Sequence, residues 1–302
     1  MTPGLSMLQP ELMTEVITLA HGADRCDVIP QLGGSIGAWS VRGQDMMRVA
    51  SAASIAAHDP YGMASFPLVP YSNRIGDGTF EWDGNVVALA QNFPPEPHAI
   101  HGVGFERPWQ VQKRTNDSVV LTLRHHPDAG WPWAFEAQQH MTLADGVLTL
   151  NLSAINLQGH SAPLAFGHHP YFPRAGAKLT FHAQGVWLVG DDGLPSRWTS
   201  PTAPLDFSEG LSVEHADIDH CFTGWSGAAR IAWPEKDWAL EITASRELPH
   251  AVVCIRSDLD AFCFEPVAHI NDALNRQERA DMPVIPPGES FRASITFRAV
   301  RR

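Results

Sequence analysis

The chain has 302 residues, of which 44% are hydrophobic and 18% charged, so it can bury the core of a globular protein. Its 21 Lys and Arg oppose 33 Asp and Glu, and the formal net charge is −12. This balance, without any basic run, argues against a nucleic-acid partner or an anionic membrane surface. A small neutral substrate suits it better.

Cysteine usage and the N-terminus indicate the compartment. The four cysteines form no CxxC pair and no disulfide framework: Cys26, Cys221, Cys254 and Cys263. Residues 1–15 lack the basic and apolar regions of a signal peptide, and no stretch approaches the ~18 apolar residues of a membrane span. We therefore expect a soluble, cytoplasmic protein, either a monomer or a homodimer.

Alternation of apolar and polar residues is the main structural signal along the chain. The first clear hairpin signal is Asp83-Gly84-Asn85, and Asp145-Gly146 predicts a second that leads into residues 147–154. Residues 291–299 alternate in the same way, which is typical of half-buried strands. Further short strands are expected at 119–123, 179–181, 187–189, 240–243, 251–254 and 261–264.

Helical periodicity is weak throughout. Residues 268–280 are the best candidate for a short helical turn, and residues 206–211 are a second. Gly and Pro, 24 of each, are spread along the chain, and no change in composition indicates a domain boundary. Many short strands without βαβ alternation predict one all-β domain over residues 1–302, a large antiparallel sandwich or barrel.

Glu265 is the carboxylate that most needs an explanation. It follows the apolar runs 251–254 and 261–264, so we expect it at the end of a mostly buried strand. Desolvation disfavours the charged form of a carboxylate in such a place. Buried carboxylates of this kind are often functional, although a structural ion pair gives the same pattern.

The pair His168-His169 precedes Pro170, which favours extended backbone at the second histidine. Successive side chains of a strand point to opposite faces, so only one of the two can face a pocket. The alternative is that both imidazoles simply pack against a sheet.

Asn73-Arg74 and His101 are the other candidate site residues. Pro67 and Pro70 restrict the backbone before Arg74, whose rigidly arranged donors suit vicinal hydroxyls or a carboxylate. An internal salt bridge of Arg74 is the structural alternative. His101 lies in a loop-like segment, where a surface position explains it equally well.

Seven short motifs in order resemble those of the aldose 1-epimerases, or galactose mutarotases, over about residues 27–302. They are Gly33-Gly34, Asn73-Arg74-Ile75, His101-Gly102, His169-Pro170-Tyr171-Phe172, Asp219-His220, Glu265-Pro266 and Asp272-Ala273-Leu274-Asn275. The resemblance implies a β-sandwich of the galactose-mutarotase type. It also implies interconversion of the α and β anomers of an aldose without metal or cofactor.

The resemblance implies Glu265 as the general base and His169 as the general acid. It implies that Arg74, His101 and Asp219 hold sugar hydroxyls, and Asn73 accompanies Arg74 in the motif. Mutarotation removes a proton from the anomeric hydroxyl and delivers one to the ring oxygen, which a carboxylate and an imidazolium can do near neutral pH.

Two departures from the family pattern affect the expected sugar specificity. Glu265-Pro266-Val267 replaces the acidic-Thr-Gln often found at the base, and Phe172-Pro173 replaces Phe-Asn. Three alternatives stay open. They are a hexose-6-phosphate mutarotase, a noncatalytic carbohydrate-binding protein, and a metal-dependent β-barrel enzyme that uses His101, His169 and Glu265.

Overall fold

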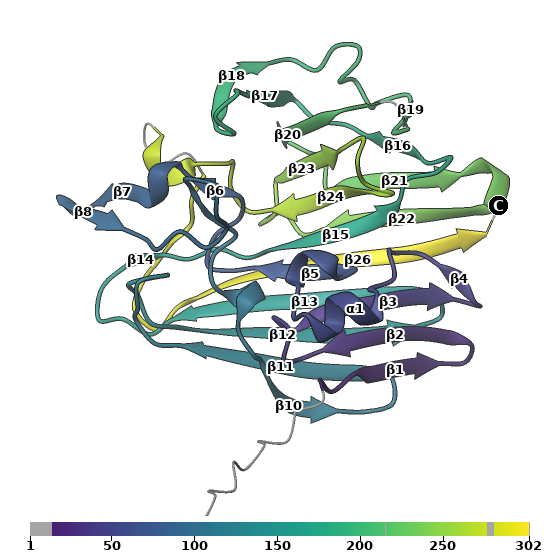
Figure 1. Ribbon diagram of the computed structural model, residues 1–302, viewed down its shortest axis with the longest axis horizontal. Helices are drawn as coiled ribbons and strands as arrows, with labels where there is room; N and C mark the ends of the chain where they lie inside the picture. Colours follow the sequence, from purple (N-terminus) through teal and green to yellow (C-terminus); the bar gives the residue numbers. More distant parts are fainter. Residues whose placement is uncertain (1–13, 215, 277–280, 302) are drawn as a thin grey trace, which may run out of the picture.

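The computed structural model describes residues 14–214, 216–276 and 281–301. Two large antiparallel sheets lie face to face and form a β-sandwich, which confirms the predicted fold class (Figure 1). None of the helices in these described ranges is long and apolar enough to cross a bilayer.

The first sheet has eleven strands. In spatial order these are β1 (Ile17–His21), β2 (Asp24–Ile29), β3 (Ser35–Val41), β5 (Ser65–Leu68), β15 (Gly167–Pro173), β24 (Ala261–Val267), β23 (His250–Ile255), β20 (Ile218–Thr223), β17 (Gly185–Val189) and β18 (Pro195–Thr199), with β4 (Gln44–Asp45) paired to β3.

The second sheet has nine strands. Their order is β10 (Gln110–Arg114), β11 (Ser118–His125), β12 (Phe135–Ala144), β13 (Val147–Asn156), β26 (Ser290–Arg301), β22 (Trp238–Ala244), β21 (Ala228–Trp233), β16 (Lys178–Phe181) and β19 (Leu211–Ser212). Three two-stranded ribbons complete the strands: β6 (Arg74–Ile75) with β9 (Ala99–Ile100), β7 (Thr79–Trp82) with β8 (Asn85–Ala88), and β14 (Ala162–Pro163) with β25 (Val284–Ile285).

The predicted strands and hairpins are confirmed. Asp83-Gly84 joins β7 to β8, and Asp145-Gly146 joins β12 to β13. All four of these turn residues have positive φ, between 48° and 76°. Both turns therefore have the left-handed backbone that matches the twist of a two-residue hairpin, which explains why Asp-Gly is a reliable signal.

The predicted helical turns are mostly wrong. Residues 206–211 form turns and the start of β19, and of residues 268–280 only Ala273–Asn275 is helical, as the 3₁₀ turn η5. Residues 277–280 of that prediction lie outside the described residues. The helical segments the sequence does form are one to two turns long, too short for a 3.6-residue period to be visible. They are α1 (Ala52–Ala56), η1 (Pro60–Gly62), η2 (Gly76–Gly78), η3 (Gly104–Glu106) and η4 (Pro234–Lys236).

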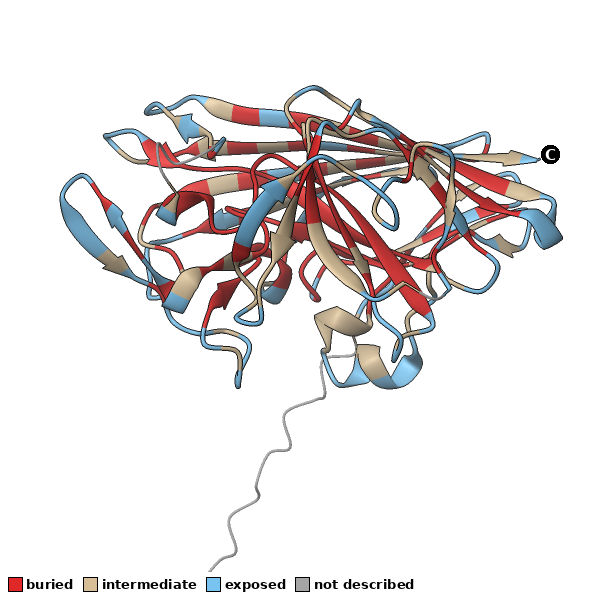
Figure 2. Ribbon diagram, turned by 90° about the horizontal axis from the view of Figure 1, so that it is seen from above, coloured by how far each residue is buried: buried red, intermediate tan, exposed pale blue. Residues whose placement is uncertain are grey.

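The core lies between the two sheets, and buried positions run through the middle of the molecule (Figure 2). The ring of Phe297 on β26 lies 6.2 Å from both Trp39 on β3 and Phe172 on β15, so the inner faces of the sheets interdigitate. Each large side chain buried there contributes about 1.5–3 kcal/mol to folding.

β15 and β24 are buried on both faces. On their inner face, Phe172 contacts Phe262, with ring centroids 5.8 Å apart. Because side chains alternate along a strand, His169 on β15 and Glu265 on β24 point to the opposite, outer face. The sequence predicted Glu265 at the end of a strand. β24 instead continues to Val267, so Glu265 lies inside the strand.

Candidate active site

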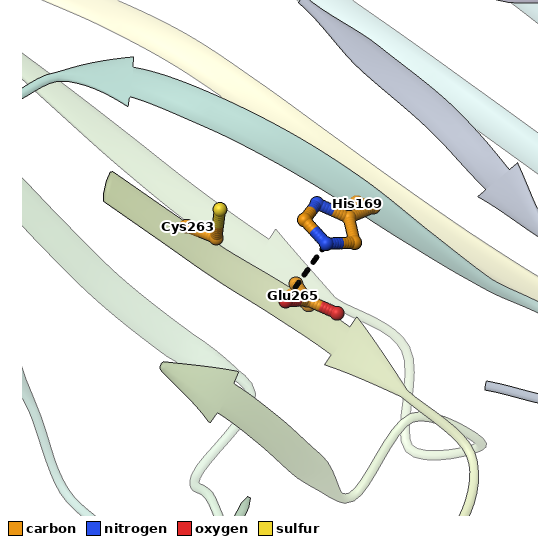
Figure 3. Close-up of side chains that lie close together, drawn as sticks. All are labelled: His169, Cys263 and Glu265. Carbon is orange, nitrogen blue, oxygen red and sulfur yellow. Dashed lines mark ion pairs between the residues drawn. The ribbon is translucent and has the colours of Figure 1, made fainter. Parts of the chain in front are cut away.

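The outer face of the first sheet brings His169 and Glu265 together. Tyr171 on β15 pairs with Cys263 on β24, and continuing this antiparallel register by two residues places His169 opposite Glu265. Their side chains meet with His169 Nε2 3.3 Å from Glu265 Oε1 (Figure 3). The 96 positions that separate them in sequence are thus bridged by neighbouring strands.

Both members of this pair are buried, with side chains 8% and 2% exposed. Burial raises the pKa of Glu265 well above its usual range, and Asp219 adds to this while Arg74 opposes it. Burial also lowers the pKa of His169, and neighbouring His101 acts in the same direction. The environment therefore disfavours the charged form of each group.

Aromatic rings fix the imidazole of His169. Phe66 on β5 stacks on it from one side at 4.5 Å between ring centroids, and Tyr171 stacks at 4.7 Å. Phe66 is the register partner of His169, so the sheet itself sets this stacking. An imidazole held in this way keeps one orientation relative to Glu265.

Two segments, one just before β6 and one just after β9, bring Asn73 and His101 together, and both residues have left-handed backbone. Their φ angles are 56° and 60°. Asn73 N–H donates to His101 Nδ1 at 3.1 Å, and His101 N–H donates to the carbonyl of Asn73 at 2.9 Å. Gly102 follows with φ 74°, and a Cβ there would lie 2.3 Å from the carbonyl oxygen of Val69, so only glycine fits.

The hydrogen bond from Asn73 determines the tautomer of His101. Because Nδ1 accepts a hydrogen bond, the ring hydrogen of the neutral imidazole is on Nε2. Burial lowers the pKa of His101 to about 3, and the positive charge of Arg74 contributes. His101 is therefore a neutral side chain that presents a hydrogen-bond donor.

Arg74 lies between two carboxylates. Its Nε is 3.2 Å from Glu96 Oε1, and its Nη1 is 3.4 Å from Asp219 Oδ2. Burial by itself would lower the pKa of Arg74, but the two carboxylates outweigh it and raise that pKa. The salt bridge considered as the structural alternative for Arg74 is thus present, and it lies inside the candidate site.

All six residues predicted for the site line one cavity of about 130 Å³: Asn73, Arg74, His101, His169, Asp219 and Glu265. The sequence did not indicate the other lining residues, which are Tyr61, Phe93, Ile100, Tyr171, Cys254, Arg256, Leu259 and Cys263. Tyr171 and Cys263 lie two residues from His169 and Glu265, so strand alternation could have found them. Tyr61 comes from the 3₁₀ turn η1 and Phe93 from a loop, and neither carried such a signal.

An outer recess of about 660 Å³ shares Arg74, Phe93 and no other residue with this cavity. Its lining includes the carboxylates of Asp77, Glu96, Asp191 and Asp192. This neighbouring recess is therefore rich in carboxylates.

This arrangement can move protons. A carboxylate and an imidazole in contact, both desolvated, face a cavity rimmed by hydrogen-bonding groups. For a metal, the described residues bring His169 and Glu265 together with Cys263 rather than with His101. The predicted metal set of His101, His169 and Glu265 does not match this grouping.

Comparison with known proteins places this geometry in context. Residues 15–298 match the family model described as aldose 1-epimerase. The uncharacterized protein YphB of Escherichia coli K12 is 28% identical over 292 residues, which cover 94% of this chain and 98% of YphB. Human galactose mutarotase is 30% identical over 128 residues, 41% of this chain and 36% of the human protein.

The fold is also found among solved structures. A crystal structure from Escherichia coli K12, of a protein given only provisionally as an aldose 1-epimerase, superposes with a TM-score of 0.89. The two chains are 27% identical, and the match covers 96% of this chain and all of the other.

Proposed function

The chain belongs to the aldose 1-epimerase family, and on that premise we propose that it interconverts the α and β anomers of a free aldose without metal or cofactor. The observation that carries the proposal is the contact of 3.3 Å between His169 Nε2 and Glu265 Oε1 at the floor of a hydrogen-bonding cavity. We propose Glu265 as the base and His169 as the acid.

Ring opening needs a proton to leave the anomeric hydroxyl while another reaches the ring oxygen. These two oxygens are bonded to the same carbon, so an acid and a base whose atoms are in contact can serve both at once. Glu265 takes the hydroxyl proton, and His169 donates to the ring oxygen. After rotation about the C1–C2 bond, the two groups reverse roles and the ring closes on the other face.

Burial of the pair assists the opening step. Ring opening converts a carboxylate and an imidazolium into a carboxylic acid and a neutral imidazole. Because burial raises the pKa of Glu265 and lowers that of His169, the carboxylate gains a proton and the imidazolium loses one more readily than the same groups in water. General acid and base groups each contribute typically about 10²–10⁴-fold in rate, which suffices for a reaction that already proceeds unaided.

Sugar hydroxyls have partners around the pair. His101 offers a ring N–H, Asp219 accepts, and Arg74 donates while its charge is balanced by Asp219 and Glu96. The rings of Tyr61 and Phe93, 4.7 Å apart, offer apolar surface for the C–H groups of a sugar.

Charge distribution favours a free sugar over a 6-phosphate. Both arginines that line the cavity are paired with carboxylates, since Arg256 donates to Asp258 at 2.7 Å and Arg74 bridges Glu96 and Asp219. A phosphate would need unpaired Arg or Lys donors or a helix N-terminus. The recess next to the cavity instead carries carboxylates, which repel a phosphate.

Polarimetry of freshly dissolved α-D-glucose, α-D-galactose, pentoses and glucose 6-phosphate tests the proposal. We expect accelerated mutarotation of at least one free aldose, weak or absent action on the 6-phosphate, and full activity after treatment with a chelator. No acceleration with any aldose, despite measurable sugar binding, would instead favour a noncatalytic carbohydrate-binding protein. Activity that disappears with chelator would favour a metal-dependent enzyme.

A further inference from the structure

The floor of the cavity contains a third side chain with metal-ligand chemistry. Cys263 and Glu265 lie two residues apart on β24, so both point to the outer face, and His169 reaches them from β15 (Figure 3). One ligand atom from each of the three lies within 4.8 Å of the others. All three residues are buried.

These spacings suit a zinc ion. Zinc binds imidazole nitrogen and carboxylate oxygen at about 2.0–2.2 Å, so the two ligand atoms of a tetrahedral site lie about 3.3–3.6 Å apart. His169 Nε2 and Glu265 Oε1, at 3.3 Å, already have this separation. The thiol of Cys263, within 4.8 Å of a ligand atom from each of the other two, would complete three ligands by a small movement.

Unsatisfied polar atoms provide a second, independent observation. Glu265 Oε2 and His169 Nδ1 are buried and have no hydrogen-bond partner within the described part of the chain. Leaving such an atom without a partner costs about 1–3 kcal/mol. A cation between the carboxylate, the imidazole and the thiol would recover part of that cost for Glu265.

Nearby carboxylates favour a cation, although the positive charge of Arg48, which acts on His169 and Cys263, opposes it. Asp219 lies close enough to influence Glu265, and Arg74, the cationic side chain that acts on this carboxylate, is itself held by Asp219 and Glu96. The acidic recess outside the cavity would attract a divalent cation rather than repel it.

We propose that His169, Cys263 and Glu265 form a binding site for a thiophilic divalent cation such as Zn²⁺, which excludes the sugar and inhibits the enzyme. Binding forms a sulfur–metal bond and releases two protons to solvent, one from the Cys263 thiol and one from the His169–Glu265 pair, with no change of oxidation state. The metal occupies the nitrogen and oxygen lone pairs that proton transfer needs, so sugar turnover and metal binding compete.

Cobalt is the spectroscopic probe for this site, because thiolate ligation of Co²⁺ gives a charge-transfer band in the near ultraviolet. We expect the metal-free full chain to show this band on titration with Co²⁺, and Zn²⁺ to abolish it by displacement. In Cys263→Ser the band should be lost, and Zn²⁺ affinity measured by calorimetry should fall by about tenfold or more, since even loss of an outer-shell partner costs about 10–100-fold.

Cys254→Ser is the matched control. Cys254 is the register partner of Cys263 and lines the same cavity, but it is not among the three grouped residues. We expect the Cys254→Ser protein to keep the cobalt band. Absence of the band in the unaltered protein, or equal Zn²⁺ affinity in Cys263→Ser, would show an adventitious ion only and overturn the site.

The inhibitory consequence rests on the proposed mutarotase activity, whereas the cobalt band does not. In polarimetry, Zn²⁺ should slow mutarotation competitively with the sugar, and chelator should restore the rate. Inhibition that the sugar does not relieve contradicts the shared site. A protein without mutarotase activity that still gives the cobalt band contradicts the proposed function and leaves the metal site intact.

Discussion

His168 and His169 are neighbours on β15, yet they occupy opposite environments. His168 faces the core between the sheets, where its Nδ1 meets Ser65 Oγ and its Nε2 lies 3.1 Å from Gln139 Oε1 on the opposing sheet. His169 faces the cavity, where Nε2 contacts Glu265 and Nδ1 has no partner among the described residues.

The difference separates structural from functional burial. Both histidines are buried, and burial lowers the pKa of both, to about 3 for His168. Only His168, on the inner face, has hydrogen-bond partners at both ring nitrogens. A buried polar group that stays partly unpaired next to an accessible cavity costs stability, and such a group is a better candidate for chemistry than its satisfied neighbour.

The largest expected effect is on the catalytic rate, from a substitution on the outer face of the first sheet. Glu265→Gln keeps the size of the side chain but removes the base, so we expect the polarimetric rate to fall by at least about 10²–10⁴-fold. Sugar binding measured by calorimetry should largely remain, because the amide occupies the same place. Near-normal turnover in this variant would refute the assignment of the base.

The next largest effect is on stability, from a substitution on the inner face of β15. His168→Ala leaves Ser65 and Gln139 without their partner and opens a cavity in the core, so the free energy of unfolding should fall by about 3–5 kcal/mol. Urea titration measures this change. The folded fraction should keep its rate constant for turnover.

His169→Gln is the matched change on the outer face. It should lower the rate by about 10²–10⁴-fold and leave the urea midpoint nearly unchanged. If the two variants behaved alike in both measurements, the division between the two faces of β15 would be wrong.

Acidification should weaken the fold through the inner histidine. The pKa of His168 is about 3 in the folded protein against about 6.5 in an unfolded chain, so the unfolded state binds the proton first. Its stabilising contribution is complete above pH 6.5 and is lost as the pH falls toward 3, at about 1.4 kcal/mol per pH unit.

His101 and His269, with pKa values lowered to about 3 and about 4, act in the same sense. Glu265 opposes them, because a raised pKa lets the folded state hold its proton at higher pH. Calorimetric melting at pH 7, 6 and 5 should show Tm falling with acid, and less steeply in His168→Gln. A Tm that rises on acidification would contradict the neutral burial of these histidines.

The smallest effect concerns the cavity wall. Arg74→Lys keeps the charge but loses the forked geometry that reaches Glu96 and Asp219 together. We expect KM for the preferred sugar to rise about tenfold with kcat little changed. A selective loss of kcat would instead give Arg74 a part in the chemistry.

The sequence predicted the parts of this molecule that follow strand alternation. The two Asp-Gly hairpins and the placement of His168 and His169 on opposite faces depend only on local geometry, and the structure has both. The nature of the acid and base came from the ordered motifs of the family, because nothing in local sequence relates residue 169 to residue 265.

The other residues that line the cavity could not be predicted from the sequence, and the reason is physical. Tyr61 reaches the cavity from the short 3₁₀ turn η1 and Phe93 from a loop, and neither segment has a periodic pattern that relates it to the strands carrying His169 and Glu265. The short helical turns failed for the same reason, since one or two turns held by their surroundings leave no periodic pattern.

The register that sets His169 opposite Glu265 has a consequence for heat inactivation. β15 and β24 are adjacent interior strands of the first sheet, and such strands usually open only when the whole fold opens. Several of the proposed sugar contacts, such as His101 and Phe93, lie outside the strands, and we expect them to loosen earlier. On heating, we therefore expect KM for the sugar to rise before kcat falls. Turnover at saturating sugar should persist up to the melting transition.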